Sequence, residues 1–249
     1  MERRIKKFKT AQDLSLELAQ KLKEEIEKKS KENKRFFISL SGGSTPKILF
    51  KILAAPPFSE EMRWDNVHLF WGDERCVPPD NIESNYGMTK DLLLDKIDFP
   101  KENIHRIKGE ANPEEEASRY SLEIKKWVSI DKDLPRFDCI LLGMGEDGHT
   151  ASLFPEKELH AVSQNICGVA EKTISVNHGE KIQKRISLTK DAICNGEKIY
   201  FLVTGNKKAK PLSEIIKETP ESNNYPALGI HNIYGYSEWW IDEDAALYL

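Results

Sequence analysis

A carboxylate and an imidazole stand two residues apart at Asp147 and His149, within the glycine-rich segment 143–155. Histidine can take up a proton near neutral pH, and a neighbouring carboxylate can orient its ring and stabilise the charged form. The segment directly follows an apolar run at Phe137–Leu142, which is typical of a buried strand. A lone histidine is usually structural, but this placement favours a general base with a supporting acid.

The same segment contains the spacing of a dinucleotide-binding fingerprint, with glycines at Gly143, Gly145 and Gly148. That fingerprint needs a long helix after the third glycine, and Pro155 would stop or kink such a helix early. The glycine spacing makes a nicotinamide-dependent oxidoreductase an alternative, and Pro155 argues against it. We favour the interpretation that the glycines shape a loop presenting the acid and the imidazole.

A second polar loop follows the apolar run Phe36–Leu40 and reads Ser41, Gly42, Gly43, Ser44 and Thr45. Glycines allow a close approach of backbone to ligand, and Pro46 fits the first turn of a helix opening there. Free N–H groups and hydroxyls at that helix start could bind a phosphate. The Gly-Lys-Ser/Thr ending of a nucleotide P-loop is missing, and a plain capped turn is the alternative.

Charged side chains follow three further apolar runs. Asp73 and Arg75 come directly after Val67–Trp71, where they could supply a catalytic carboxylate and a guanidinium that faces substrate. Arg185 and Lys208 lie near the ends of other segments and could complete a phosphate site. Such residues are most often solvated surface charges, so each is weak evidence alone.

The elements that must position these residues alternate between helix and strand. Thr10 can cap a helix whose apolar residues recur every four positions at Leu14, Leu18, Leu22 and Ile26. Further helices are expected at 86–94, 113–128 and 207–217, and a strand at 198–203. The pattern predicts an α/β fold in which helices cover both faces of a mostly parallel sheet, and residues 1–249 form a single domain. Ligands of such sheets bind beyond the carboxyl ends of the strands.

Composition excludes several classes of protein. The 249 residues are 39% hydrophobic and 31% charged, and 37 basic against 41 acidic residues give a net charge of −4. This balance disfavours a nucleic-acid partner, and no apolar stretch reaches the ~18 residues of a membrane span. We expect a cytoplasmic protein. The cysteines and histidines show no metal-ligand spacing, so no metal is predicted, and Cys139 is interpreted as a core residue.

Four motifs together resemble the glucosamine-6-phosphate isomerase/6-phosphogluconolactonase family. They are residues 41–46, residues 71–75 with 84–87, residues 142–155, and residues 204–205 with 208–209. The resemblance runs nearly from end to end and implies a Rossmann-like fold of the sugar-phosphate isomerase type. It also implies hydrolysis of 6-phospho-D-glucono-1,5-lactone to 6-phospho-D-gluconate. The sequence departs from the family at Glu156, where glycine is common, and at 178–183, where a proline-rich stretch is frequent.

The deaminase/isomerase branch of the family is the main alternative. In that branch a glutamate precedes the proline of the histidine loop, whereas this chain has Phe154 before Pro155. The carboxylate associated with ring opening is therefore missing, which favours the lactonase branch. A non-catalytic sugar-phosphate-binding protein is a further alternative, although such a protein would not need both Asp147 and His149.

The resemblance implies a role for each candidate residue. Residues 41–45, Lys208 and Arg185 would hold the phosphate. His149 would take a proton from the attacking water, and Asp147 or Asp73 would steady the imidazolium. Arg75 would stabilise the oxyanion. An activated ester needs no cofactor, so the expected partner is only the phosphorylated sugar lactone, and we expect a monomer.

Overall fold

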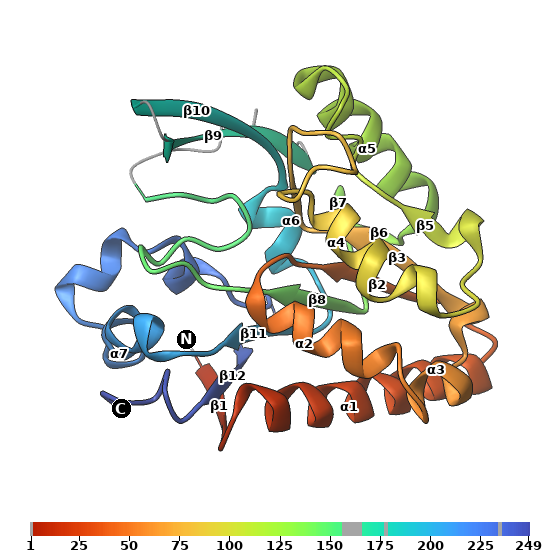
Figure 1. Ribbon diagram of the computed structural model, residues 1–249, viewed down its shortest axis with the longest axis horizontal. Coiled ribbons are helices and arrows are strands. Elements are labelled where there is room, and N and C mark those ends of the chain that lie inside the picture. Colours follow the sequence, from red (N-terminus) through yellow and green to blue (C-terminus); the bar gives the residue numbers. More distant parts are fainter. Residues whose placement is uncertain (1, 156–165, 177–178, 234–235) are drawn as a thin grey trace.

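The computed structural model describes residues 2–155, 166–176, 179–233 and 236–249, and its centre is a seven-stranded parallel sheet (Figure 1). The spatial order of the strands is β1, β12, β11, β8, β2, β3 and β5. Their bounds are β1 Glu2–Phe8, β2 Phe36–Leu40, β3 Val67–Trp71, β5 Ile104–His105, β8 Cys139–Leu142, β11 Ile199–Val203 and β12 Tyr236–Asp242. The predicted parallel sheet is confirmed.

Helices cover both faces of this sheet, as predicted. The helices are α1 Ala11–Lys31, α2 Ser44–Leu53, α3 Phe58–Glu61, α4 Asn85–Leu92, α5 Pro113–Trp127, α6 Lys190–Cys194 and α7 Ala209–Lys217. Figure 1 shows α1 and α2 on one side of the sheet and α5 and α6 on the other. In the described ranges no helix is both long and apolar enough to span a membrane.

Helix α1 forms where its sequence pattern predicts. The Thr10 hydroxyl accepts a hydrogen bond from the N–H of Asp13 at 3.1 Å and so caps the first turn. Leu14 and Leu18 are fully buried, since one residue in four returns to the same face of a helix. The stripe packs inward, while charged residues on the opposite side of the helix, such as Asp13 and Glu24, are exposed.

A second, antiparallel sheet was not predicted. It consists of β4 Asp73–Arg75, β10 Gly179–Leu188 and β9 Cys167–Val176, in that spatial order. The charged residues after β3 therefore belong to a short strand, and not to a surface loop as their composition suggested. A small hairpin of β6 Ile130–Asp131 and β7 Leu134–Pro135 completes the described strands.

The topology creates a crevice between β2 and β8. From β2 the chain continues to its neighbour β3 on one side, whereas from β8 it continues to β11 on the other side. Segments that leave the carboxyl ends of β2 and β8 therefore diverge, which is the usual position of a ligand site in such sheets. Cys139 of β8 is fully buried, and burial raises the pKa of its thiol well above the ordinary value, so the prediction of a core residue is confirmed.

Candidate active site

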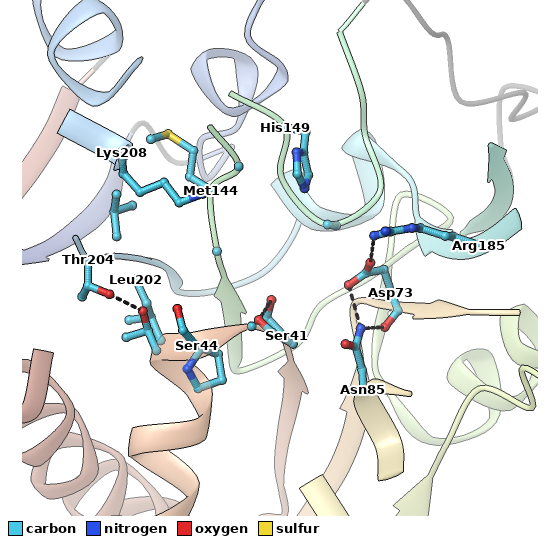
Figure 2. Close-up of a pocket in the computed structure, with 18 of the residues that line it drawn as sticks. Ser41, Ser44, Asp73, Asn85, Met144, His149, Arg185, Leu202, Thr204 and Lys208 are labelled. Atoms are coloured by element: carbon cyan, nitrogen blue, oxygen red, sulfur yellow. Dashed lines mark hydrogen bonds and ion pairs between the residues drawn. The ribbon is translucent and has the colours of Figure 1, made fainter. Parts of the chain in front are cut away.

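A cavity of about 290 Å³ opens at the carboxyl ends of β2, β8 and β11 (Figure 2). All of the predicted site residues except Asp147 line it. They are Ser41, Gly42, Gly43, Ser44, Thr45, Asp73, Arg75, His149, Arg185 and Lys208. Sequence segments separated by more than a hundred residues thus meet in one place. Among the described residues, no cluster of His, Cys, Asp or Glu is arranged to hold a metal ion.

The loop 41–45 leads into α2 with its helix start uncapped. Helix α2 begins at Ser44, two residues before the predicted start at Pro46. Gly43 precedes it with a φ of 107°, a left-handed value that favours glycine, and no side chain caps the first turn. The N–H groups at this helix start have no intrahelical acceptor and lie at the cavity wall. The alternative of a turn capped by serine or threonine is therefore wrong.

Two contacts fix this loop against neighbouring segments. A Cβ atom at position 42 would collide with the side-chain amide of Asn85, so only Gly42 permits their close approach. The hydroxyl oxygens of Thr45 and Thr204 are 2.6 Å apart, which joins the start of α2 to the end of β11. The loop is thus held open toward the cavity by packing rather than by a cap.

Lys208 supplies an unpaired cation at the same end of the cavity. It closes the turn Asn206–Lys208 before α7 and is half-buried. Burial lowers the pKa of its ammonium group, and no described residue forms a hydrogen bond or ion pair with it. Figure 2 shows Lys208 reaching the cavity on the same side as Ser44. A cation and free backbone N–H groups together suit a phosphate.

His149 is held by Asp147, which stands behind it. The Nδ1 atom of His149 bonds to Oδ1 of Asp147. Because a carboxylate can only accept, Nδ1 carries the proton, and Nε2 of the neutral ring is left as an acceptor. Partial burial acts to raise the pKa of Asp147. The hydrogen bond from His149, the charge that this ring carries when protonated, and the charge of Lys172 together hold that pKa well below its ordinary value. The Lys172 ammonium is 3.4 Å from the second carboxylate oxygen.

The glycines of the histidine loop serve this geometry. A Cβ atom on Gly145 would collide with the His149 ring, and Gly148 has a φ of 71°. Residues 149–155 contain no helix, so the crossover helix that a dinucleotide fingerprint requires does not follow the third glycine. The structure thus supports the interpretation that the glycines shape a presenting loop.

Asp73 has different partners from those expected of a support for the histidine. Its Oδ2 atom accepts a hydrogen bond from the Ser152 hydroxyl at 2.8 Å and lies 3.9 Å from the Arg185 guanidinium. No hydrogen bond joins Asp73 to His149 within the described chain. Of the two carboxylates considered from the sequence, Asp147 is the one that bonds the imidazole.

Arg75 and Arg185 face each other across β4 and β10, where they occupy paired register positions. Arg75 donates through Nη1 to the backbone carbonyl of Glu83, while its buried Nε has no hydrogen-bond partner. Arg185 is buried and lies with its guanidinium carbon 5.5 Å from the centre of the Phe154 ring. Burial and the charge of Arg75 lower the pKa of Arg185.

The cavity therefore has two positively charged ends. Figure 2 shows Lys208 on one side, Arg185 on the opposite side, and the His149 ring between them. From the sequence we grouped Arg185 with Lys208 around one phosphate. In the structure Arg185 instead lies beside Asp73 at the other end.

Several residues of the site were not identified as candidates, among them Asn85, Lys172 and Gln183. Asn85 lines the cavity, Lys172 contacts Asp147, and Gln183 contacts Arg185. Asn85 belongs to the motif at 84–87 that contributed to the family resemblance, so a signal for it existed. Lys172 and Gln183 lie on the β9–β10 hairpin, whose sequence has no apolar run that would predict a buried strand. Of the departures from the family pattern, Glu156 and the first residue of the stretch 178–183, His178, lie outside the described residues.

A cavity at the switch point of a parallel sheet, with a histidine at its centre and one end whose cation and backbone N–H groups suit a phosphate, fits an α/β enzyme acting on a small phosphorylated molecule. The chain belongs to the family described as glucosamine-6-phosphate isomerases/6-phosphogluconolactonase, whose model matches residues 9–239.

Known proteins of this family resemble the chain over nearly its whole length. A 6-phosphogluconolactonase of Aggregatibacter actinomycetemcomitans is 44% identical over 239 residues, which cover 96% of this chain and 97% of that protein. One from Haemophilus influenzae is 46% identical over 84% of this chain and 85% of its own length. The crystal structure of the 6-phosphogluconolactonase from Trypanosoma brucei, 26% identical, covers 100% of this chain and 99% of its own, with a TM-score of 0.83.

Proposed function

We propose that this protein hydrolyses 6-phospho-D-glucono-1,5-lactone to 6-phospho-D-gluconate, a step of the oxidative pentose phosphate pathway. The observation that carries the proposal is the carboxylate-bound His149 in a cavity whose one end suits a phosphate. Relatives that are 44% and 46% identical bear the name of this activity. The enzyme is accordingly a hydrolase that acts on a cyclic carboxylic ester.

The phosphate of the substrate binds where Lys208 and the start of α2 meet. There the unpaired ammonium and the free N–H groups of Ser44 and Thr45 provide donors for its oxygens. The hydroxyls of residues 41–45 add further donors. This end anchors the molecule, and the lactone carbonyl then extends past His149 toward Arg75 and Arg185.

Hydrolysis proceeds by addition of water to C1. Nε2 of neutral His149 takes a proton from the water as its oxygen bonds to C1, and the carbonyl electrons move onto oxygen. Asp147 stabilises the resulting imidazolium, while Arg75 faces the oxyanion. The C1–O5 bond then breaks, and the ring oxygen takes the proton back from His149. The product is an open-chain acid, which ionises to the carboxylate.

Phe154 favours this reaction over deamination. Its ring centre is 5.0 Å from that of His149, so an apolar side chain covers the imidazole where the deaminase branch is expected to have glutamate. Isomerisation and deamination need further proton transfers, for which this ring offers no group. Lactone hydrolysis needs only one base that returns its proton.

The test measures two activities in parallel. The phospholactone is generated enzymatically, and its hydrolysis by the purified protein is followed above the spontaneous background. Glucosamine 6-phosphate is supplied separately, and ammonia release is measured. We expect lactone hydrolysis without ammonia release. Ammonia release with no acceleration of lactone hydrolysis would assign the protein to the other branch, and neither activity would favour a binding protein.

We also propose that the protein acts as a cytoplasmic monomer with neither nucleic acid nor membrane as partner. The net charge of −4 disfavours a nucleic-acid partner. Sedimentation velocity should give the mass of one chain, 28.6 kDa, and a stable dimer would contradict the proposal.

A further inference from the structure

Gln183 is a buried amide behind the arginine end of the cavity. Its side chain is only 4% exposed, whereas that of the preceding Ile182 is 63% exposed. Side chains alternate between the two faces of a strand, so Gln183 and Arg185 point to the same, inward face of β10. A polar side chain at such a position requires partners, and Gln183 has them on both sides.

The partners fix the orientation of the amide. The Oε1 atom of Gln183 accepts hydrogen bonds from Nε and Nη2 of Arg185, at 3.1 and 2.8 Å. Its Nε2 atom donates to a carboxylate oxygen of Glu83 at 3.0 Å. A guanidinium can only donate and a carboxylate can only accept, so the reversed amide would lose all these bonds. Gln183 thus holds Arg185 in one orientation.

The neutrality of this support matters because Arg185 stands opposite Arg75. Two like charges at paired positions of neighbouring strands repel, and a carboxylate at position 183 would relieve that repulsion by cancelling one charge. The amide instead accepts from two of the N–H groups of Arg185, on Nε and Nη2, and adds no charge of its own. The buried Nε of Arg75 still has no partner. The arginine pair therefore retains donors and positive charge for a ligand.

We propose that Gln183 is a positioning residue that holds Arg185 in line with Arg75 without adding a negative charge, so that the two arginines bind anionic oxygens on C1 of the substrate and product. This inference rests on the proposed function, which places C1 at the arginine end. The ligand class is a sugar phosphate whose far end carries a carboxylate or a developing oxyanion. Gln183 itself does not touch the ligand.

Two ligands that differ at C1 can test what the arginine end of the cavity binds. Sugar phosphates 6-phosphogluconate and glucitol 6-phosphate share the phosphate and the carbon chain, but the first has a carboxylate at C1 and the second a hydroxymethyl group. Their dissociation constants are measured by calorimetry with the intact protein. We expect the wild type to bind 6-phosphogluconate more tightly by at least roughly tenfold, since hydrogen bonds to charged groups are the strong ones.

Three variants separate position, charge and fold. Gln183→Met keeps the length of the side chain but not its hydrogen bonds. It should raise the dissociation constant of 6-phosphogluconate roughly tenfold and leave that of glucitol 6-phosphate unchanged. The double exchange Glu83→Gln with Gln183→Glu keeps the net charge and the bond between the two side chains, but sets a carboxylate against Arg185. It should abolish the preference. Glu83→Gln alone should retain it.

Lys184→Gln provides a control for charge. Lys184 neighbours Gln183 on the opposite face of β10, where it pairs with Glu114 in solvent. This variant loses one positive charge without touching the arginine pair, and its preference should match the wild type. Thermal unfolding of every variant establishes that it is folded.

Several results would overturn the proposal. If Gln183→Met weakened the binding of both ligands equally, Arg185 would be placed at the phosphate. An unchanged preference in the double exchange, with only a lower melting temperature, would leave Gln183 a structural residue. A wild type without preference for the carboxylate would also contradict it. Retained preference together with absent lactone hydrolysis would instead refute the proposed function alone.

Discussion

Two histidine–carboxylate pairs occur among the residues that the structure describes, and one of these two lies at the cavity. His149 bonds to Asp147 at the end of β8, and the ring lines the cavity. His105 bonds to Glu123 with 2.8 Å between Nδ1 and Oε1, and its other ring nitrogen is 2.9 Å from Nδ1 of His68. The first pair leaves one nitrogen for a ligand, whereas both nitrogens of His105 are used by the protein.

Aromatic side chains pack around the buried pair of His105 and Glu123. The His105 ring stacks on Phe70 with centres 4.4 Å apart, and His68 lies close to Trp127. Burial, with the charges of His105 and Arg35, lowers the pKa of His68 to about 4. The comparison teaches that a carboxylate beside a histidine does not by itself make a base. Access of the second nitrogen to a cavity distinguishes the two pairs.

Removing the imidazole at the cavity should have the largest effect. His149→Ala should lower kcat for the lactone by about 10² to 10⁴ with little change in KM, because a general base acts in the transition state. Steady-state kinetics with the enzymatically generated lactone measure this. A kcat near that of the wild type would remove His149 from the role.

His105→Ala is the matched variant in the buried pair. It should lower the free energy of unfolding by about 3 kcal/mol, because it leaves a cavity and a carboxylate without its partner. The kcat of the folded protein should stay unchanged. Urea unfolding and kinetics on the same preparation test both statements, and a large fall in kcat at full folding would erase the contrast.

Acid should weaken the fold through His68, whose ring stacks on His105 of the buried pair. His68 has a pKa near 4 in the folded protein and about 6.5 when unfolded, so the unfolded chain binds more protons between these values. Stability is complete above pH 6.5 and is lost as the pH falls toward 4, by up to about 3 kcal/mol. Urea unfolding at pH 7.5 and 5 measures the loss. His68→Phe should show a flatter dependence, and an equally steep one would assign it elsewhere.

Two lysines should show the same contrast between a residue at the cavity and one elsewhere. Lys208 is unpaired at the cavity, whereas Lys29 pairs with Asp138 on another part of the surface. Lys208→Ala should raise KM roughly tenfold with a smaller change in kcat, because the phosphate contact exists in ground and transition states alike. Lys29→Ala should leave KM unchanged. Equal KM values in the two variants would place Lys208 outside the site.

The fold was predictable where strands are buried on both faces. Runs such as Phe36–Leu40 and Val67–Trp71 are apolar at four of five positions, because helices cover the sheet on both sides. The edge strand β1 is mostly charged, with Ile5 and Phe8 as its two apolar residues, and could not be identified in this way. The hairpin of β9 and β10 was missed because its outer residues, such as Ile182 and Lys184, mix apolar and charged types.

The site was predictable where a residue directly follows a buried strand. Ser41 and Thr204 follow such strands, and His149 lies on the loop that leaves β8. Gln183 depends on the hairpin folding back beside β4, a long-range contact that local patterns do not contain. The sequence also could not separate Asp147 from Asp73 as the partner of the histidine, since both are acids beside strand ends.

The kcat of Asp147→Asn tests most directly the assignment of His149, held by Asp147, as the base. The carboxylate accepts from Nδ1 of His149 and so leaves Nε2 free to take a proton, whereas an amide can donate to Nδ1 and place the ring proton on Nε2. The kcat for the lactone should therefore fall by about 10² to 10⁴ in Asp147→Asn. It should stay unchanged in His105→Ala. A kcat of Asp147→Asn near that of the wild type would contradict the assignment.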